Sequence, residues 1–216
     1  MAYGIVIVLT VALAHFVSAI PGPVDLAQDA RDTSMYNLVN GYFRIEARIL
    51  RMENPRGTTR NMVPCDVLKV GKCDTKVSAA IDWHTPNYDF GKDSVPYSNY
   101  VLIYDGTGTS SVNINQTIVK DVCNQATRKV NLRIRAVDKD ILSENTIDHW
   151  SCFIYTTTPP AANAAAARWS DVQTTAGHNG SHKVTWQYRW YFIDRNQCQN
   201  SSGSSSLVSR FIPFAG

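Results

Sequence analysis

The stretch Lys183-Val184-Thr185-Trp186-Gln187-Tyr188-Arg189-Trp190-Tyr191-Phe192 decides the fold class of this 216-residue chain. Apolar and aromatic residues occupy every second position, and mostly polar or charged residues lie between them. Successive side chains of a β-strand point to opposite faces of a sheet, so this period of two predicts a strand with one buried face. The buried face is expected to carry three aromatic residues, Trp186, Tyr188 and Trp190. The opposite face would meet solvent or a partner through Gln187, Arg189 and Tyr191.

Five more segments show the same alternation or a short apolar run: residues 43–49, 77–83, 101–104, 112–118 and 130–136. The alternation of the first segment slips at Leu50, and Asn54-Pro55-Arg56-Gly57 then predicts a turn. No window has a convincing helical period. Several short strands with one buried face each require two sheets that close on each other. The sequence therefore predicts an all-β protein built as an antiparallel β-sandwich.

The composition agrees with a folded chain. Hydrophobic residues make up 44% of the sequence and charged residues 18%, which is enough apolar surface for a core and too little charge for a disordered chain. The formal net charge is +3 and contains no dense basic run. This charge distribution argues against a protein that binds nucleic acid.

The N-terminus predicts secretion. Residues 3–14 form an apolar run of the length of a signal-peptide core, and Val17-Ser18-Ala19 offers the small residues that cleavage requires. A membrane anchor would need about 20 apolar residues, but His15 and Pro21 interrupt this run. We therefore expect a cleaved signal peptide at residues 1–19 and an extracellular, secreted product.

The rest of the chain is expected to contain a loose leader at residues 20–40, a folded module at 41–198 and a flexible Ser-rich tail at 199–216. Within the module, residues 156–167 are of low complexity and predict a long loop. Three Asn-x-Ser/Thr sequons agree with secretion and are candidate N-glycosylation sites: Asn115, Asn179 and Asn200.

Four pieces of the chain carry a resemblance to a known family. They are Gly41-Tyr42-Phe43-Arg44-Ile45-Glu46 with residues 49–57; Lys72-Cys73-Asp74-Thr75; Val130 to Asp140; and Trp169 with Thr174-Thr175-Ala176-Gly177 and residues 183–192. In order and spacing they resemble the N-terminal (MNNL) module of Notch ligands of the Delta and Serrate/Jagged type. The resemblance covers about residues 41–198. It implies a C2-like antiparallel β-sandwich, in which Thr174 to Gly177 form a polar turn.

The same resemblance implies partners. The protein would contact the EGF repeats of Notch-type receptors or membrane lipid headgroups, and would modulate signalling rather than start it. The family's receptor-binding domain, EGF repeats and membrane span have no counterpart in these 216 residues, and a ligand without an anchor could not pull on a receptor. Cys198 stands about where the first cysteine of the next family domain would be, which implies an unpaired cysteine.

Five cysteines allow two disulfides and one remaining thiol. One candidate bridge joins Cys65 and Cys73 across a short loop, and another joins Cys123 and Cys152. Spacing alone does not fix this connectivity. Cys198 would then form an intermolecular bridge, and hence a disulfide-linked homodimer, or would stay a capped or free thiol.

Asp138 and Asp140 directly follow a predicted strand, where a C2 sandwich has a calcium loop. Ca²⁺ takes oxygen ligands from several loops, so these two carboxylates are candidate calcium ligands. Asp66, Asp74 and Glu144 could complete the coordination shell. The alternative is that Asp138-Lys139-Asp140 is an ordinary solvated turn.

The two histidines at 178 and 182 are a weaker candidate for metal binding. His178 and His182 are four residues apart, a spacing that can bind a metal on a helix. Gly180 lies between them and a predicted strand follows, so we expect a solvated hairpin loop instead.

No catalytic pattern emerges. Asp82 with His84, and His149 with Ser151, are pairs expected by chance, and the sequence contains neither HExxH nor G-x-S-x-G. We therefore expect a secreted, non-enzymatic binding module with Ca²⁺ as its one candidate cofactor. The alternative is an extracellular matrix or coat protein linked through Cys198, and a secreted hydrolase is the weakest hypothesis.

Overall fold

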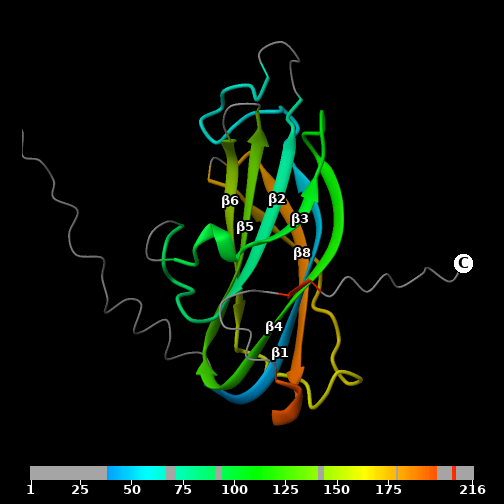
Figure 1. The fold of residues 1–216 in the computed structure, drawn as a ribbon. Helices are drawn as coiled ribbons and strands as arrows, with labels where there is room; N and C mark the ends of the chain where they lie inside the picture. The colour runs from blue at the N-terminus through cyan, green and yellow to red at the C-terminus, as the bar shows by residue number, and fades with distance from the viewer. Residues whose placement is uncertain are drawn as a thin grey trace, which may run out of the picture. The chain divides into compact units, whose positions relative to one another are not determined.

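The structure is a computed structural model that describes residues 38–66, 72–90, 94–140, 144–178, 180–198 and 206–207 (Figure 1). The predicted signal peptide, nearly all of the predicted leader and most of the predicted tail lie outside these residues. Two of the sequons, at Asn179 and Asn200, lie outside them as well.

Two antiparallel sheets form the fold. One has the strand order β7-β8-β1-β4-β9 and the other β3-β2-β5-β6. The first sheet is built from β1 (Val39–Glu53), β4 (Val112–Thr127), β7 (Gln173–Ala176), β8 (Lys183–Phe192) and β9 (Ser206–Leu207). The second is built from β2 (Thr75–Asp82), β3 (Val101–Asp105), β5 (Lys129–Lys139) and β6 (Glu144–Tyr155). The predicted all-β, antiparallel sandwich is confirmed.

Helical structure is scarce in the part of the chain that the structure describes. It consists of two short 3₁₀ turns, η1 (Tyr97–Asn99) and η2 (Arg195–Gln197). None of the helices among the described residues is long and apolar enough to cross a membrane.

The core follows from the alternation along the strands. In β1 the side chains of Phe43, Ile45, Ala47 and Ile49 are fully buried, and in β8 the indole of Trp190 meets the ring of Phe43 edge to face, with centroids 5.9 Å apart. Trp186 and Trp190 are buried as predicted, while Tyr188 lies partly buried against the core. Each strand contributes one apolar face, and the two sheets close over these faces.

The slip of the alternation at Leu50 corresponds to a β-bulge. The pairing of β1 with both β4 and β8 shifts between Ile49 and Arg51, and Met52 returns to the core. On β4 the facing Asn115 has a left-handed backbone with φ of 52°, a conformation that asparagine tolerates better than most residues. Asn115 is exposed, which leaves this sequon accessible.

Residues 156–172, here called the β6–β7 segment, run along the edge of β8, and Trp169 reaches over the outer face of β8 and β1. Ala161 forms a β-bridge with Tyr191. The guanidinium groups of Arg48 and Arg189 both lie over the indole of Trp169, at 4.2 and 4.9 Å from the ring centroid. The β6–β7 segment, which includes the predicted loop at 156–167, therefore covers part of this face of the sheet through Trp169.

This cover corrects the expectation for the outer face of β8. Tyr191 is buried, with 5% of its surface exposed, and its hydroxyl donates to Glu46 at 2.7 Å. Arg189 also pairs with Glu46, at 2.7 Å. The partner of these side chains is the protein's own chain.

Two strands were missed or misread. β6 has no simple alternation in its first half and was not predicted, and Thr174-Thr175-Ala176 belongs to β7 instead of a polar turn. β7 is short and pairs only with the start of β8, so little in its own sequence marks it as a strand.

The antiparallel order brings four connections to one end of the sandwich, at the top of Figure 1. We call this the loop end. Its described residues are 54–66 and 72–74 between β1 and β2, 106–111 between β3 and β4, Asp140 after β5, and 177–178 with 180–182 between β7 and β8.

Candidate cation site at the loop end

Asp138, at the end of β5, lies at the centre of the candidate site. Its side chain is buried, with 2% of the residue exposed. Oδ1 accepts a hydrogen bond from the backbone N–H of Asp74 at 2.7 Å. Oδ2 is also buried, and among the described residues it has no hydrogen-bond partner. A buried carboxylate oxygen without a partner costs free energy, so Oδ2 is a candidate ligand atom for a cation.

Three more carboxylates act on Asp138. Burial raises the pKa of Asp138 above its usual value, the N–H of Asp74 partly offsets this, and the charges of Asp140, Asp74 and Asp66 raise it further. The loop end thus gathers four carboxylates, two from the β1–β2 connection and two from the end of β5. Their mutual repulsion is relieved when a cation binds between them.

Local hydrogen bonds fix two of these neighbours. Asp74 Oδ1 accepts the backbone N–H of Gly108 at 2.7 Å, and the backbone carbonyl of Asp74 accepts the N–H of Lys139 at 2.8 Å. Asp140 Oδ2 accepts from the amide of Asn145 at 2.8 Å. The site is therefore tied to β5, β6 and the β3–β4 connection.

The structure brings four of the five proposed calcium ligands together and leaves Glu144 apart. Glu144 forms ion pairs with Lys76 at 3.0 Å and with Arg135 at 3.5 Å. The hydrogen bond from Lys76 is the main reason why the pKa of Glu144 lies below its usual value. Glu144 is thus engaged by cations of the protein itself.

The disulfides correct part of the cysteine prediction. Cys65 and Cys73 are bonded, with Cα atoms 5.1 Å apart, which is the first pairing that the sequence suggested. Cys123 is bonded to Cys198, across 75 residues, and not to Cys152. Cys152 is a free thiol in the core, and burial raises its pKa to about 12. It lies in the core on β6, with 1% of its surface exposed.

Because Cys198 is bonded within the chain, it is not the unpaired cysteine. The expected disulfide-linked homodimer through Cys198, and the matrix or coat protein linked in the same way, lose their covalent basis.

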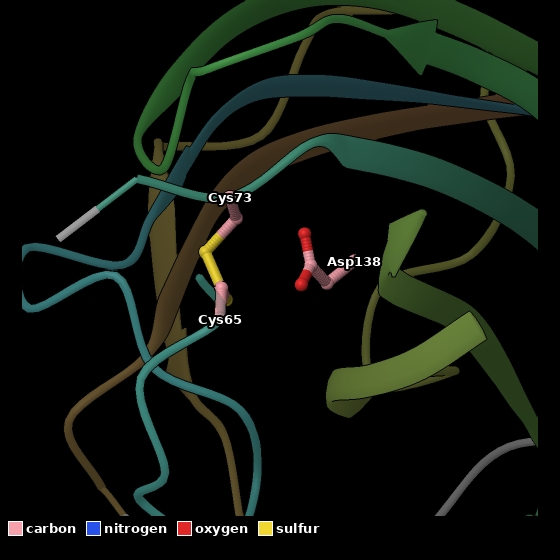
Figure 2. Close-up of side chains that lie close together, drawn as sticks. All are labelled: Cys65, Cys73 and Asp138. Carbon is pink, nitrogen blue, oxygen red and sulfur yellow. A yellow bond between two sulfur atoms is a disulfide. The ribbon is translucent and has the colours of Figure 1, made fainter. Parts of the chain in front are cut away.

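The Cys65–Cys73 bridge holds the acidic cluster in place. Asp66 directly follows Cys65, and Asp74 directly follows Cys73, so the disulfide fixes the spacing of two carboxylates. Figure 2 shows the carboxylate of Asp138 facing the bridge, and the two sulfurs and a carboxylate oxygen of Asp138 lie within 4.8 Å of one another. Sequence reasoning chose the carboxylates but could not show that the bridge lies among them.

An apolar tip lies beside the acidic cluster. Thr58 forms a β-bridge with Pro64, and the backbone N–H of Thr59 donates to the carbonyl of Val63 at 2.8 Å. This small hairpin exposes 41% of Met62 and 55% of Val63. We call Met62 and Val63 the apolar tip.

The predicted solvated loop is wrong for one of the two histidines. His182 is buried, with 1% exposed. Its Nδ1 donates to Asp148 at 3.0 Å, and its Nε2 lies 3.1 Å from the hydroxyl of Thr58. A Cβ at Gly177 would collide with Asp148, so the hairpin needs glycine there. These contacts tie the β7–β8 connection and the β1–β2 connection to β6.

Asp148 is the anchor of this arrangement. Burial alone would raise its pKa, but hydrogen bonds from His182 and from the backbone N–H groups of His178 and His149 hold the pKa below its usual value. Asp148, His182 and Thr58 follow one another in the order of acid, imidazole and hydroxyl that a hydrolase triad has. Thr58, however, is only 7% exposed. A substrate could not reach its hydroxyl without opening the loop end.

The other chance pairs have structural partners. Asp82 forms a buried ion pair with Arg133 at 2.7 Å, with 1% and 0% of the two side chains exposed. His149 stacks on Phe90 with ring centroids 4.5 Å apart. Neither Asp82 with His84 nor His149 with Ser151 forms a catalytic grouping among the residues described.

An open groove of about 520 Å³ lies far from the acidic cluster along the strands. It is lined by Arg44, Tyr191, Phe192 and residues 162–165, among others. The guanidinium of Arg44 is already held by Asp121, with N–O distances of 2.6 and 2.9 Å. The positive charge of Arg44 in this groove is therefore already neutralised by Asp121.

The fold and the loop end define a class: a two-sheet antiparallel sandwich that gathers carboxylates from the β1–β2 connection and the end of β5 at one end. Comparison with solved structures agrees. The chain matches a C2 domain protein from Ramazzottius varieornatus with 42% sequence identity and a TM-score of 0.74, over 78% of this chain and 99% of that chain. The protein belongs to the C2 domain family.

More distant structures share the fold less closely. Human GIVD cytosolic phospholipase A2 matches with 13% identity and a TM-score of 0.48, over 73% of this chain and 18% of the enzyme. Drosophila C2-DSL-EGF1 matches with 10% identity and a TM-score of 0.43, over 69% of this chain and 67% of that chain. Likenesses at this level carry no inference about partners. No protein-family model and no curated protein matches the sequence.

Proposed function

We propose that this C2 protein is secreted and binds anionic lipid headgroups at cell surfaces through a calcium ion held at the loop end. The observation that carries the proposal is the buried, unpartnered Oδ2 of Asp138 among three further carboxylates. Secretion is supported by the sequence of residues 1–19 and by two disulfides, since disulfides persist in oxidising compartments.

The residues present fit Ca²⁺ better than a softer metal while the disulfide is intact. Asp66, Asp74, Asp138 and Asp140 supply carboxylate oxygens, which are the ligands that Ca²⁺ prefers, and Ca²⁺ accepts irregular shells of about 6 to 8 oxygens. A bound calcium ion would supply positive charge that a lipid phosphate can share. Without it, the cluster repels anionic lipid.

The surroundings of the cluster suit a membrane surface. Met62 and Val63 are exposed at the apolar tip, and burying their side chains in the acyl region would be worth roughly 1 to 2 kcal/mol each. Arg56 and Lys72 are exposed on the same connection and would attract anionic headgroups. The calcium ion would orient the domain, while the tip and the basic side chains would contribute affinity.

The test is sedimentation of the protein with vesicles of phosphatidylcholine alone or mixed with phosphatidylserine, with Ca²⁺ or with a chelator. We expect binding only with both phosphatidylserine and Ca²⁺. Asp138→Asn should abolish it, whereas Asp171→Asn, the same charge change at an exposed position on the β6–β7 segment, should not. Val63→Asp should weaken vesicle binding and leave calcium binding intact, as measured by titration calorimetry.

Calcium-independent binding, or wild-type behaviour of Asp138→Asn in both assays, would contradict the proposal. Either result would mean that the carboxylate cluster is not the lipid-binding element.

Binding to Notch-type EGF repeats is the second candidate function. It is favoured by the sequence pieces at 41–57, 72–75 and 130–140, which resemble the Notch-ligand module. Immobilised EGF-repeat fragments distinguish the two candidates. Val63→Asp should weaken vesicle binding, whereas receptor binding that does not use the apolar tip would persist in this variant. Binding to these fragments but not to vesicles would establish the receptor as the partner.

A further inference from the structure

Cys65, Cys73 and Asp138 form a set of three potential metal-ligand atoms inside the loop end. The two sulfurs and the carboxylate oxygen lie within 4.8 Å of one another, and all three residues are buried, with 8%, 1% and 2% exposed. Oδ2 of Asp138 has no hydrogen-bond partner among the described residues, and its carboxylate faces the sulfurs (Figure 2). A buried carboxylate with one unpartnered oxygen therefore lies next to two sulfurs.

The donor set changes its chemistry with the redox state of the cysteines. While the sulfurs are bonded to each other they are poor ligands, and only the carboxylate can hold a metal. When the bridge is reduced, the same position offers two thiolates and one carboxylate. Zn²⁺ binds such mixed sulfur and oxygen sets, with Zn–S of about 2.3 Å and Zn–O of about 2.0 to 2.2 Å. We propose that reduction of Cys65–Cys73 converts this cluster into a site for Zn²⁺.

The redox step needs a dithiol reductant and balances as a thiol–disulfide exchange. A thiolate of the reductant attacks Cys65 Sγ, the Cys65–Cys73 bond breaks, and Cys73 leaves as a thiolate. The second thiol of the reductant then displaces Cys65 and forms the reductant's own disulfide. Two electrons reach the protein, and Zn²⁺ binding releases any proton that either cysteine carries.

The surroundings of the two sulfurs favour this direction of attack. Cys65 is the more exposed of the pair. Cys73 Sγ accepts hydrogen bonds from the amide of Asn54 at 3.4 Å and from the hydroxyl of Ser110 at 3.6 Å. Such donors stabilise a departing thiolate, and they would orient it as a metal ligand afterwards. Three protein ligands leave the fourth position of a zinc tetrahedron to water.

The metal would replace the bridge as the clamp of the β1–β2 connection. The bridge and the zinc site use the same two sulfurs, so they exclude each other. Bound Zn²⁺ therefore slows reoxidation of Cys65 and Cys73, and the disulfide blocks zinc binding. This inference does not depend on calcium or lipid, because those are tested on the oxidised protein.

The experiment uses the full chain, reduced with a phosphine and transferred to a metal-free buffer. Zn²⁺ is titrated by calorimetry, and Co²⁺ serves as a spectroscopic probe through its thiolate charge-transfer band. We expect one equivalent of metal in the reduced protein, none on sulfur in the oxidised protein, and at least about tenfold weaker binding in Asp138→Asn. Asp171→Asn should bind as the wild type does.

Alkylation of the wild type, read by mass spectrometry, tests the site without relying on a cysteine variant. Zn²⁺ should protect Cys65 and Cys73 of the reduced chain, and it should leave Cys123 and Cys198 reactive. Protection of Cys123 and Cys198 instead, unchanged affinity in Asp138→Asn, or a reduced chain that stays unfolded when Zn²⁺ is added would each overturn the proposal.

Discussion

The pairing of Cys123 with Cys198 makes a quantitative prediction about stability. A cross-link lowers the conformational entropy of the unfolded chain, and this loss grows with the logarithm of the number of residues in the loop that it closes. The Cys123–Cys198 bridge spans 75 residues and the Cys65–Cys73 bridge spans 8. The loop-entropy relation gives about 4.5 kcal/mol for the long loop and about 2.5 kcal/mol for the short one at 25 °C. The long bridge should therefore contribute about 2 kcal/mol more.

The assay is urea unfolding of oxidised protein, followed by tryptophan fluorescence. The double variant Cys123→Ala/Cys198→Ala should lose about 4.5 kcal/mol of unfolding free energy, which shifts the midpoint by roughly 2 M urea for a domain of this size. Cys65→Ala/Cys73→Ala should lose about 2.5 kcal/mol. Cys152→Ala removes a sulfur without removing a bridge, and so measures the cost of the sulfur atom alone.

Two results would refute this reasoning. Equal losses in the two double variants would show that loop length does not govern the contribution of the bridges. A Cys198→Ala variant that loses a higher-mass species in non-reducing electrophoresis would show that Cys198 bonds to another chain, contrary to the Cys123–Cys198 pairing.

Three further predictions concern charges. Asp82→Asn leaves the buried guanidinium of Arg133 without its charged partner and should lower the free energy of unfolding in urea by about 3 to 5 kcal/mol. Adding Arg133→Met should recover part of the lost stability. If it recovers none, the ion pair is not the cause of the loss. Burial, with two nearby arginines, lowers the pKa of His149 to about 4. The folded state thus binds this proton less readily than the unfolded state, so stability is full above about pH 6.5 and declines by up to about 3 kcal/mol between pH 6.5 and 4. His149→Gln should flatten that decline in thermal melts, and an unchanged slope would assign it to other groups. The raised pKa of Asp138 means that its ionised form destabilises the metal-free fold, and this destabilisation grows as pH rises through its folded pKa. Asp138→Asn should therefore raise Tm at pH 7 in chelator and remove the Tm increase caused by Ca²⁺. A lower Tm of this variant in chelator would show that the carboxylate is stabilising without a cation.

The strands were predictable where local alternation and burial agree. In β8 the apolar residues Val184, Trp186 and Trp190 are buried. In β1 the slip at Leu50 is visible in the sequence because a bulge reverses the phase of the alternation. The same reasoning missed β7, whose four residues are stabilised by their pairing with β8 rather than by their own pattern. The outer face of β8 was misread because its cover, the β6–β7 segment, has no pattern that assigns it to that face.

The site was predictable only in part, for a related reason. Asp138 and Asp140 follow the strand predicted at 130–136, and a carboxylate in that position has a direct sequence signal. Glu144 also carries a carboxylate, but it forms an ion pair with Lys76 of β2. His182 carries no signal at all, since its partners Asp148 and Thr58 are 34 and 124 residues away. Contacts of this range depend on the topology of the sheets, which alternation does not specify.

The contacts around the acidic cluster explain how four carboxylates can lie close together before a cation binds. Like charges drive a mobile loop apart, so the cluster survives only if the covalent and hydrogen-bonded ties of the β1–β2 connection are stronger than the repulsion. The Cys65–Cys73 bridge is one tie, the contact of His182 with Thr58 is a second, and the hydrogen bond from the N–H of Arg60 to the carbonyl of Thr146 at 2.9 Å is a third. Together they hold the ligands in place before the ion arrives, and this preorganisation lowers the ordering cost of binding. The buried pair of His182 and Asp148 therefore serves the same site as the carboxylates, although it does not touch the ion.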